Sequence, residues 1–265
     1  MLKLKNVTKV FLRNMPDEVT ALSDINFSIK EGDFVTIIGS NGAGKSTLLN
    51  VIMGLYPIDS GCIELMGTDI SRTPPHQRAK YMGRIAQDPG ASVCAVMTIE
   101  ENLAMAALRG QRRGLRIAVN SKNRAYFKEV LSELGLGLEE RLSARVGTLS
   151  GGQRQALALL MATLAKPKLL LLDEHIASLD PKTAEQVMQL TNELVTKERL
   201  TTLMVTHNMA EAIRWGERLI MMHEGKIILD ISGDEKRCLK VGDLTEKFHE
   251  VCEQEFAVDR MLLSV

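Results

Sequence analysis

The sequence has no excess of charge of either sign. Its 265 residues include 33 lysines and arginines and 33 aspartates and glutamates, so the formal net charge is zero. A general nucleic-acid-binding protein usually carries a basic excess, and this composition argues against that class. Apolar residues make up 45% of the chain, enough for a substantial core. The length fits one large domain or a core with one inserted subdomain.

Cysteine pairs and long apolar runs are also missing. The four cysteines contain no C-x-x-C pair, which argues against a metal cluster or a disulfide framework and favours reduced thiols. The longest apolar stretch, Ala156 to Ala165, is about half the length of a membrane-spanning helix. The first residues lack the basic-then-apolar order of a signal peptide. We therefore expect a soluble protein that reaches a membrane only through a partner.

Short apolar segments predict strands. Residues in the first thirty alternate as in strands, and the run F-V-T-I-I-G at 34–39 suits a central strand buried on both faces. Two further runs predict strands, L-L-L-L-D at 169–173 and T-T-L-M-V-T-H at 201–207. The segment 218–230 predicts a hairpin that turns at the Glu-Gly pair 224–225.

Helices are predicted between these strands. One is K-S-T-L-L-N-V-I-M, and another begins after Asp180, with Pro181 at the first helical position. The stretch from about Pro89 to Lys166 is mainly helical in pattern, and Thr98 and Glu101 form a capping-box pattern within it. Strand and helix alternation broken by one helical block predicts an α/β core with a helical insertion.

One segment is strongly basic and contains no acid. A solvated surface is the favoured interpretation, and contact with anionic lipid or with a partner near the membrane is the alternative. Its cations are Arg109, Arg112, Arg113, Arg116, Lys122 and Arg124.

A glycine-rich loop predicts a phosphate site. The segment G-S-N-G-A-G-K-S-T matches G-x-x-x-x-G-K-[ST] and lies between a predicted strand and a predicted helix, as the motif requires. Its glycines let successive backbone N–H groups point at phosphate oxygens, and the helix N-terminus adds partial positive charge. Lys45 would reach the β- and γ-phosphates, and Ser46 would coordinate magnesium. The predicted ATP-binding residues of this loop are Gly39, Ser40, Asn41, Gly42, Ala43, Gly44, Lys45, Ser46 and Thr47.

Two acids end the strand predicted at 169–173. Asp173 is placed to hold magnesium, usually through water, as in other P-loop NTPases. Glu174 is placed to polarise the water that attacks the γ-phosphate. The alternative, that the two acids only cap a helix, is less favoured because a phosphate-binding loop is predicted as well.

The segment T-L-S-G-G-Q-R-Q resembles the signature motif of ATP-binding cassette (ABC) ATPases. Other landmarks of that family occur in the same order along residues 1 to 235. By resemblance, Gln87 is the Q-loop glutamine, Asp180 belongs to the D-loop, His207 is the switch histidine, and Phe11 stacks on adenine. The signature residues, which would contact ATP held by a partner chain, are Leu149, Ser150, Gly151, Gly152 and Gln153.

The resemblance implies a P-loop NTPase (RecA-like) α/β core with an N-terminal antiparallel β subdomain and an inserted α-helical subdomain. The ABC ATPase domain would span residues 1–235, with its core at about 1–90 and 167–235 and its helical subdomain at about 91–166. Residues 236–265 would form a short C-terminal extension. The implied cofactors are ATP and Mg²⁺. The implied catalytic residues are Glu174, His207, Lys45 and Gln87, and the implied magnesium ligands are Ser46, Gln87 and Asp173.

The family also implies partners. Two cassettes pack head to tail, so a second ABC ATPase subunit is expected, in a homodimer or with a related chain. A transmembrane permease would hold the dimer at the cytoplasmic face of the membrane. An extracytoplasmic substrate-binding protein would deliver a small organic solute such as an amino acid. The segment D-E-H-I-A-S-L-D suggests an aromatic amino acid. No nucleic-acid partner is expected.

Other functions share these motifs. An ABC exporter or a mechanical membrane complex would carry every one of them, and only the coupling surface near residues 88 to 100 and the partner would separate them. Soluble ABC ATPases of DNA repair, chromosome structure or translation typically add long coiled coils, zinc modules or a second cassette, and none of these is visible in the sequence.

His175 departs from the family pattern, which has proline after the glutamate. It could be a second acid/base group, a metal ligand or a residue without catalytic function. Because Glu174 and His207 already supply the water-orienting carboxylate and the γ-phosphate contact, the sequence favours a spacer or loop-packing residue.

Overall fold

A six-stranded sheet forms the centre of the protein. The computed structural model describes residues 1–111, 118–248 and 250. The strand order in this sheet is β10-β9-β3-β8-β7-β6, parallel except for the hairpin of β9 and β10. The bounds are β3 (Phe34–Gly39), β6 (Met82–Ile85), β7 (Leu169–Asp173), β8 (Thr201–Val205), β9 (Arg218–His223) and β10 (Lys226–Ser232).

Both faces of the central sheet are covered. In β7, Leu169 and Leu171 pack on the side of helix α1 (Lys45–Met53), whereas Leu170 and Leu172 pack on the opposite side. Because every residue of this strand is buried, its unbroken leucine run is what a two-sided strand requires. The sequence prediction of central buried strands is confirmed.

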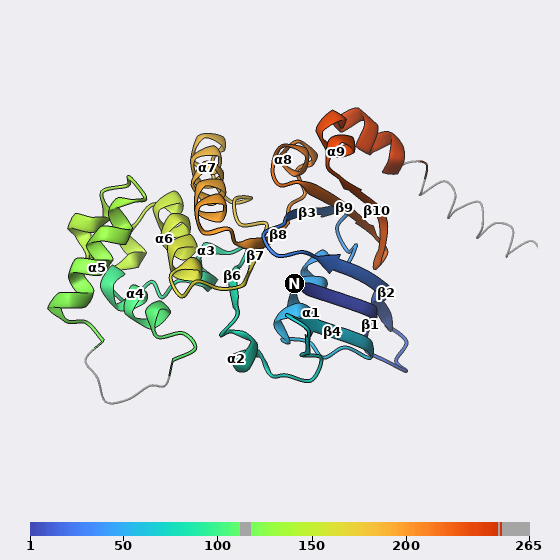
Figure 1. The fold of residues 1–265 in the computed structure, drawn as a ribbon, viewed down its shortest axis with the longest axis horizontal. Helices are drawn as coiled ribbons and strands as arrows, with labels where there is room; N and C mark the ends of the chain where they lie inside the picture. Colours follow the sequence, from blue (N-terminus) through green and yellow to red (C-terminus); the bar gives the residue numbers. More distant parts are fainter. Residues whose placement is uncertain (112–117, 249, 251–265) are drawn as a thin grey trace, which may run out of the picture.

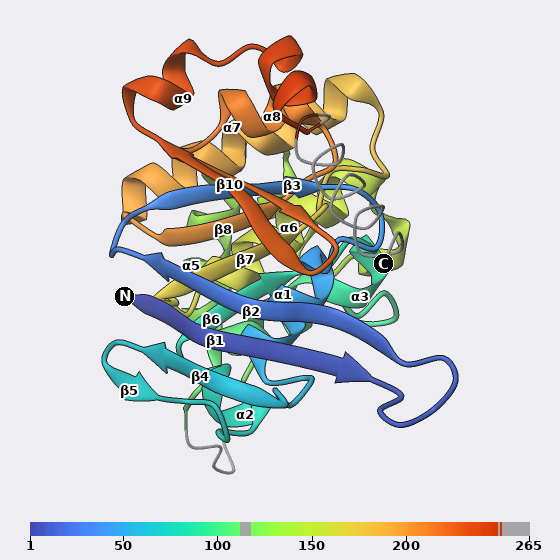
Figure 2. The same ribbon diagram turned by 90° about the vertical axis from the view of Figure 1, so that its right-hand side faces the viewer.

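A second, antiparallel sheet encloses α1 from the other side (Figure 2). Its order is β2-β1-β4-β5. Burial alternates along its strands, so one face packs on α1 and the other meets solvent. The bounds are β1 (Leu2–Phe11), β2 (Val19–Ile29), β4 (Ser60–Leu65) and β5 (Thr68–Asp69).

Helices cover the other face of the central sheet and extend beyond it. Figure 1 shows α4, α5 and α6 on the side of the molecule away from the antiparallel sheet. The predicted capping box at Thr98 and Glu101 is present at the start of α4. Between strands β6 and β7 the structure has α3 (Pro89–Ser92), α4 (Ile99–Ala107), α5 (Ser121–Ser132), η1 (Leu138–Arg141), η2 (Val146–Thr148) and α6 (Gly151–Thr163).

The remaining helices are α2 (Pro75–Arg78), α7 (Pro181–Glu198), α8 (Met209–Arg214) and α9 (Asp234–Cys238). Asp180 caps α7 and Pro181 is its first residue, as the sequence predicts. Lys236 of α9 is buried and its Nζ donates to the carbonyl oxygens of Trp215 and Gly216, so the start of the C-terminal segment packs on the core. Among the helices described, none is both long and apolar enough to cross a bilayer.

The basic segment is described only in part. Arg112, Arg113 and Arg116 lie outside the described residues. Arg109 donates to the carbonyl oxygen of Ala162, and the guanidinium of Arg124 makes a two-pronged ion pair with Glu100. These two cations therefore have contacts within the protein.

Candidate active site

The glycine-rich loop curls between β3 and α1. Gly44 lies in the left-handed region at φ 94° and is the N-cap of α1. A Cβ at this position would lie 2.4 Å from the carbonyl oxygen of Ala21, so only glycine fits both the conformation and the space. The structure leaves Ser40, Asn41, Gly42 and Ser46 exposed, half-buries Gly39, Gly44 and Thr47, and buries Ala43.

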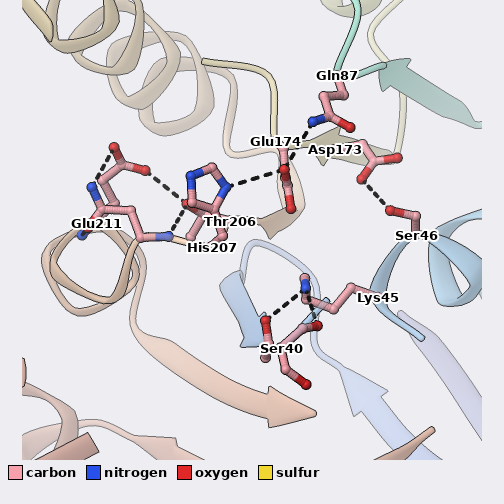
Figure 3. A network of polar contacts seen from close by, with 11 residues as sticks. Ser40, Lys45, Ser46, Gln87, Asp173, Glu174, Thr206, His207 and Glu211 are labelled. Atoms are coloured by element: carbon pink, nitrogen blue, oxygen red, sulfur yellow. Dashed lines mark hydrogen bonds and ion pairs between the residues drawn. The ribbon is translucent and has the colours of Figure 1, made fainter. Parts of the chain in front are cut away.

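Lys45 points back into this loop, as Figure 3 shows. Its Nζ donates to the carbonyl oxygens of Gly39 at 2.8 Å and Ser40 at 2.9 Å, and the residue is 6% exposed. Burial lowers the pKa of the Lys45 amine, and the nearby carboxylates of Glu174 and Asp173 oppose that shift. The Lys45 amine therefore lies inside the loop, where phosphate oxygens could replace the two carbonyl oxygens as its hydrogen-bond acceptors.

Asp173 connects the end of β7 to the first turn of α1. Its Oδ1 accepts from the Ser46 hydroxyl at 3.1 Å, and its Oδ2 accepts from Nη2 of Arg84 at 3.2 Å. A hydroxyl and a carboxylate at this separation are oxygen donors of the kind that Mg²⁺ uses together with substrate phosphates. The residues present therefore fit a magnesium ion.

Glu174 lies beside this pair at the start of the loop after β7. Its backbone is in the left-handed region at φ 46°, which is uncommon for a residue with a side chain and is found at strained functional positions. Its Oε2 contacts Nε2 of Gln87 at 3.2 Å and Nδ1 of His207 at 3.3 Å (Figure 3). The structure thus brings three predicted residues together around one carboxylate oxygen.

The loop carrying His207 is held by polar contacts that the sequence analysis missed. The Thr206 hydroxyl donates to Oε2 of Glu211 at 2.9 Å. Asn208 caps α8 by accepting from the backbone N–H groups of Ala210 and Glu211. The spacing of Asn208 and Glu211 after a predicted strand is a helix-start signal that could have revealed them.

His175 is buried and contacts helix α7. It is 1% exposed, and its Nε2 lies 3.3 Å from the Thr191 hydroxyl on α7. The Thr191 hydroxyl already donates to the carbonyl oxygen of Val187, so Nε2 of His175 carries the proton and donates. Burial lowers the pKa of His175 to about 4. An imidazole that is buried and neutral at neutral pH supports the prediction of a packing residue.

Phe11 ends β1 and already has aromatic and cationic neighbours. Its ring meets Tyr56 edge to face with centroids 5.2 Å apart, and the Lys9 ammonium lies 5.2 Å from the Phe11 centroid. Lys9 also pairs with Asp59 at 3.2 Å.

The signature segment starts α6 with a capping box. The Ser150 hydroxyl accepts from the Gln153 N–H, and the Gln153 side chain accepts from the Ser150 N–H. A Cβ on Gly152 would lie 2.2 Å from Cγ2 of Thr183, so α6 and α7 approach closely there. Asp180 accepts from the Thr183 N–H, which joins the signature region to the D-loop. Leu149 is buried and Gly151 is half-buried.

These signature residues are not brought to the phosphate loop of the same chain. Ser150, Gly152 and Gln153 line a hollow of about 480 Å³ whose other walls come from α7 and from the segment after α5. None of the loop residues 39–47 lines it.

Arg84 is another site residue that the sequence analysis missed. It is the one cation in the short strand β6, whose segment M-G-R-I is otherwise apolar or glycine. β6 runs parallel to β7, so a side chain on it can reach the polar end of β7. The sequence could have revealed it, because a charged residue inside an edge strand indicates a partner among the two acids that end the neighbouring strand.

Comparisons with known proteins identify a family and several relatives. The family model described as "ABC transporter" matches residues 22–177. A tyrosine transport ATP-binding protein of Clostridioides difficile is 44% identical, covering 94% of this chain and 98% of its own length. A phosphonates import ATP-binding protein of Frankia casuarinae is 33% identical, over 86% of this chain and 88% of its own. A dimeric ATP-binding cassette solved with ADP and Pi is 30% identical, with a TM-score of 0.75, and the match covers 88% of this chain and 98% of that one.

Proposed function

The chain belongs to the ABC transporter family, and we propose that it drives uptake of an aromatic amino acid such as tyrosine. It is the ATP-hydrolysing subunit of an importer of a small organic solute. The amino-acid assignment rests on the 44% identity, over nearly the whole chain, to a tyrosine transport ATP-binding protein.

The cluster around Glu174 carries the catalytic proposal. In the phosphate loop, the backbone amides and Lys45 bind the β- and γ-phosphates of ATP. The Glu174 carboxylate orients the attacking water and accepts its proton. His207, whose Nδ1 lies 3.3 Å from that carboxylate, contacts the γ-phosphate, and Gln87 on the same oxygen senses it.

In this proposal three residues would bind magnesium. The Ser46 hydroxyl and the Asp173 carboxylate, 3.1 Å apart, hold the ion, which when bound neutralises phosphate charge. Gln87 is a third ligand in the proposal, although its amide nitrogen points at Glu174.

Phe11 supplies the adenine contact from the end of β1.

We propose that the active unit is a head-to-tail homodimer. Ser150 to Gln153 then meet the γ-phosphate bound by the other chain; in support, the hollow that Ser150, Gly152 and Gln153 line is bordered by no residue of their own phosphate loop. Within each chain we assign the core to residues 1–90 and 167–235, the helical subdomain to 91–166 and an extension to 236–265.

We propose that a permease segment docks in a groove of about 390 Å³ between α2, α4, α6 and β6. Its walls mix apolar and cationic side chains and contain no acid, so the fitting occupant has apolar residues and a carboxylate. This contact would hold the cassette at the cytoplasmic face of the membrane. A substrate-binding protein outside the membrane would load the permease.

Reconstitution tests the whole proposal. The subunit, its co-purified permease and the binding protein are placed in vesicles with ATP, and uptake of labelled tyrosine and ATP hydrolysis are measured together. We expect tyrosine-dependent uptake that Glu174→Gln abolishes. ATP turnover coupled to efflux, or uptake of a phosphonate in place of tyrosine, would contradict the substrate and direction proposed.

A further inference from the structure

Arg84 lies between the magnesium site and the groove. From the edge strand β6, its Nη2 donates to Oδ2 of Asp173 at 3.2 Å. The same side chain forms part of the groove wall. One guanidinium therefore contacts the carboxylate proposed to hold magnesium and also borders the space proposed for the permease.

The groove contains positive charge that no carboxylate of its lining balances. Its residues include Arg84, Arg109 and His76, and burial lowers the pKa of Arg109. Nε of Arg84 is buried and has no hydrogen-bond partner among the described residues. The groove is lined by His76, Ala79, Arg84, Ser92, Met105, Ala106, Arg109, Gly110, Ala158, Met161 and Ala162.

The charge of Arg84 works against a divalent cation at Asp173. The carboxylate is buried, and its two oxygens are divided between Ser46 on one side and Arg84 on the other. A positive charge on a ligand's second oxygen weakens its attraction for a metal ion, and the effect is larger in a partly buried site. A carboxylate arriving in the groove would share the guanidinium and reduce that opposition.

We propose that Arg84 is a positioning residue that restrains Asp173 while the groove is empty and releases it to magnesium when a permease carboxylate binds. The device would keep ATP hydrolysis low in a cassette without its partner. It rests on the proposed roles of Asp173 and of the groove.

The first test uses the full-length isolated subunit. The Mg²⁺ concentration that gives half-maximal binding of a fluorescent ATP analogue is measured for the wild type, Arg84→Met and Arg84→Lys. We expect Arg84→Met to need roughly fivefold less Mg²⁺, because a positive charge has been removed. Arg84→Lys keeps the positive charge beside Asp173 and should remain within about twofold of the wild type.

The outcomes separate this inference from the proposed function. If wild-type binding of the analogue does not depend on Mg²⁺, the proposed magnesium site is wrong. If the wild type depends on Mg²⁺ but Arg84→Met needs the same or more, the Arg84 inference is overturned. Arg84→Gln, measured alongside with thermal melting of each variant, replaces Arg84→Met should that variant unfold.

The second test uses the assembled transporter. In Arg84→Met, the rate of ATP hydrolysis without transported substrate should rise several-fold. The ratio of the rate with substrate to the rate without it should then fall. Arg84→Lys should keep the wild-type ratio. An unchanged ratio in Arg84→Met would contradict a role for Arg84 in coupling.

Discussion

At the scale of single residues, the arrangement around Glu174 has the sharpest consequences. Its backbone is in the left-handed region, and its carboxylate contacts both Gln87 and His207. A residue held in such a conformation persists only where the surrounding structure fixes it. The contacts of this carboxylate are therefore expected to matter for rate more than for stability.

Glu174→Gln should bind ATP and hydrolyse it slowly. Loss of a general base typically costs on the order of 10²–10⁴ in rate, or about 3–5 kcal/mol of barrier. The glutamine amide still accepts a hydrogen bond, so nucleotide binding is retained and the ATP-bound dimer accumulates. Gel filtration with ATP and Mg²⁺ checks this. Only monomer in that experiment would contradict either the dimer or the role of Glu174.

The buried His175 should make stability depend on pH. Its pKa is about 4 in the folded protein, below the ordinary value of 6.5, so the unfolded chain binds the proton first as pH falls. Stability is therefore lost as pH falls from 6.5 toward 4. Between about pH 7.5 and pH 5 the loss is about 2 kcal/mol.

His175→Gln is the matched control for this dependence. Glutamine can still donate to Thr191 but does not titrate, so urea unfolding at both pH values should show a smaller loss than in the wild type. Equal losses in the two proteins would mean that His175 does not carry the effect.

His175 and His207 should differ in catalysis. His175→Gln should keep ATP turnover within roughly tenfold, a barrier change of about 1.4 kcal/mol or less. His207→Ala should lose about 10² or more, because a γ-phosphate contact is missing in the transition state. Turnover of the assembled transporter is the measurement. If both variants are equally inactive while still binding ATP, His175 belongs to the catalytic set.

At the scale of elements, the contact of α6 with α7 joins the signature segment to the D-loop. Gly152→Ala would place a methyl group against Cγ2 of Thr183. Alanine alone would favour the helix by about 1 kcal/mol, but the overlap should dominate and destabilise the protein by about 1–3 kcal/mol. Thermal or urea unfolding measures the change.

The double variant Gly152→Ala with Thr183→Ser tests the cause. Serine lacks the clashing methyl group and keeps the hydroxyl, so stability should return to the wild-type value or slightly above. A double variant as unstable as Gly152→Ala would show that the contact with Thr183 is not responsible.

At the scale of the whole molecule, the separation of signature and phosphate loop predicts shared sites. A mixture of Ser150→Arg chains and Lys45→Ala chains forms dimers in which one composite site carries both lesions and the other carries none. ATP hydrolysis by the mixture should exceed that of either variant alone.

Nucleotide binding completes that experiment. The mixed dimer should retain one ATP molecule per dimer, bound at the intact site. Mixed dimers that bind ATP at two equivalent sites would contradict the composite arrangement, and so would an absence of mixed dimers.

Several features were decided by the sequence alone, because they depend on neighbours in the chain. The loop around Lys45, the apolar strand ending in Asp173 and Glu174, and the cap at Asp180 are local patterns that the structure reproduces. Such patterns are set by backbone sterics, burial on two sheet faces and N-terminal capping, which act over a few residues.

Tertiary structure decided what depends on contacts between distant segments. That His175 is buried against Thr191 could not be read from its place beside Glu174, because Thr191 lies on α7. The close approach at Gly152 comes from Thr183, and the proposed role of Arg84 rests on its contact with Asp173 on the neighbouring strand. Burial and charge pairing at these positions arise only when the strands and helices pack together, so they could not be predicted from the order of residues along the chain.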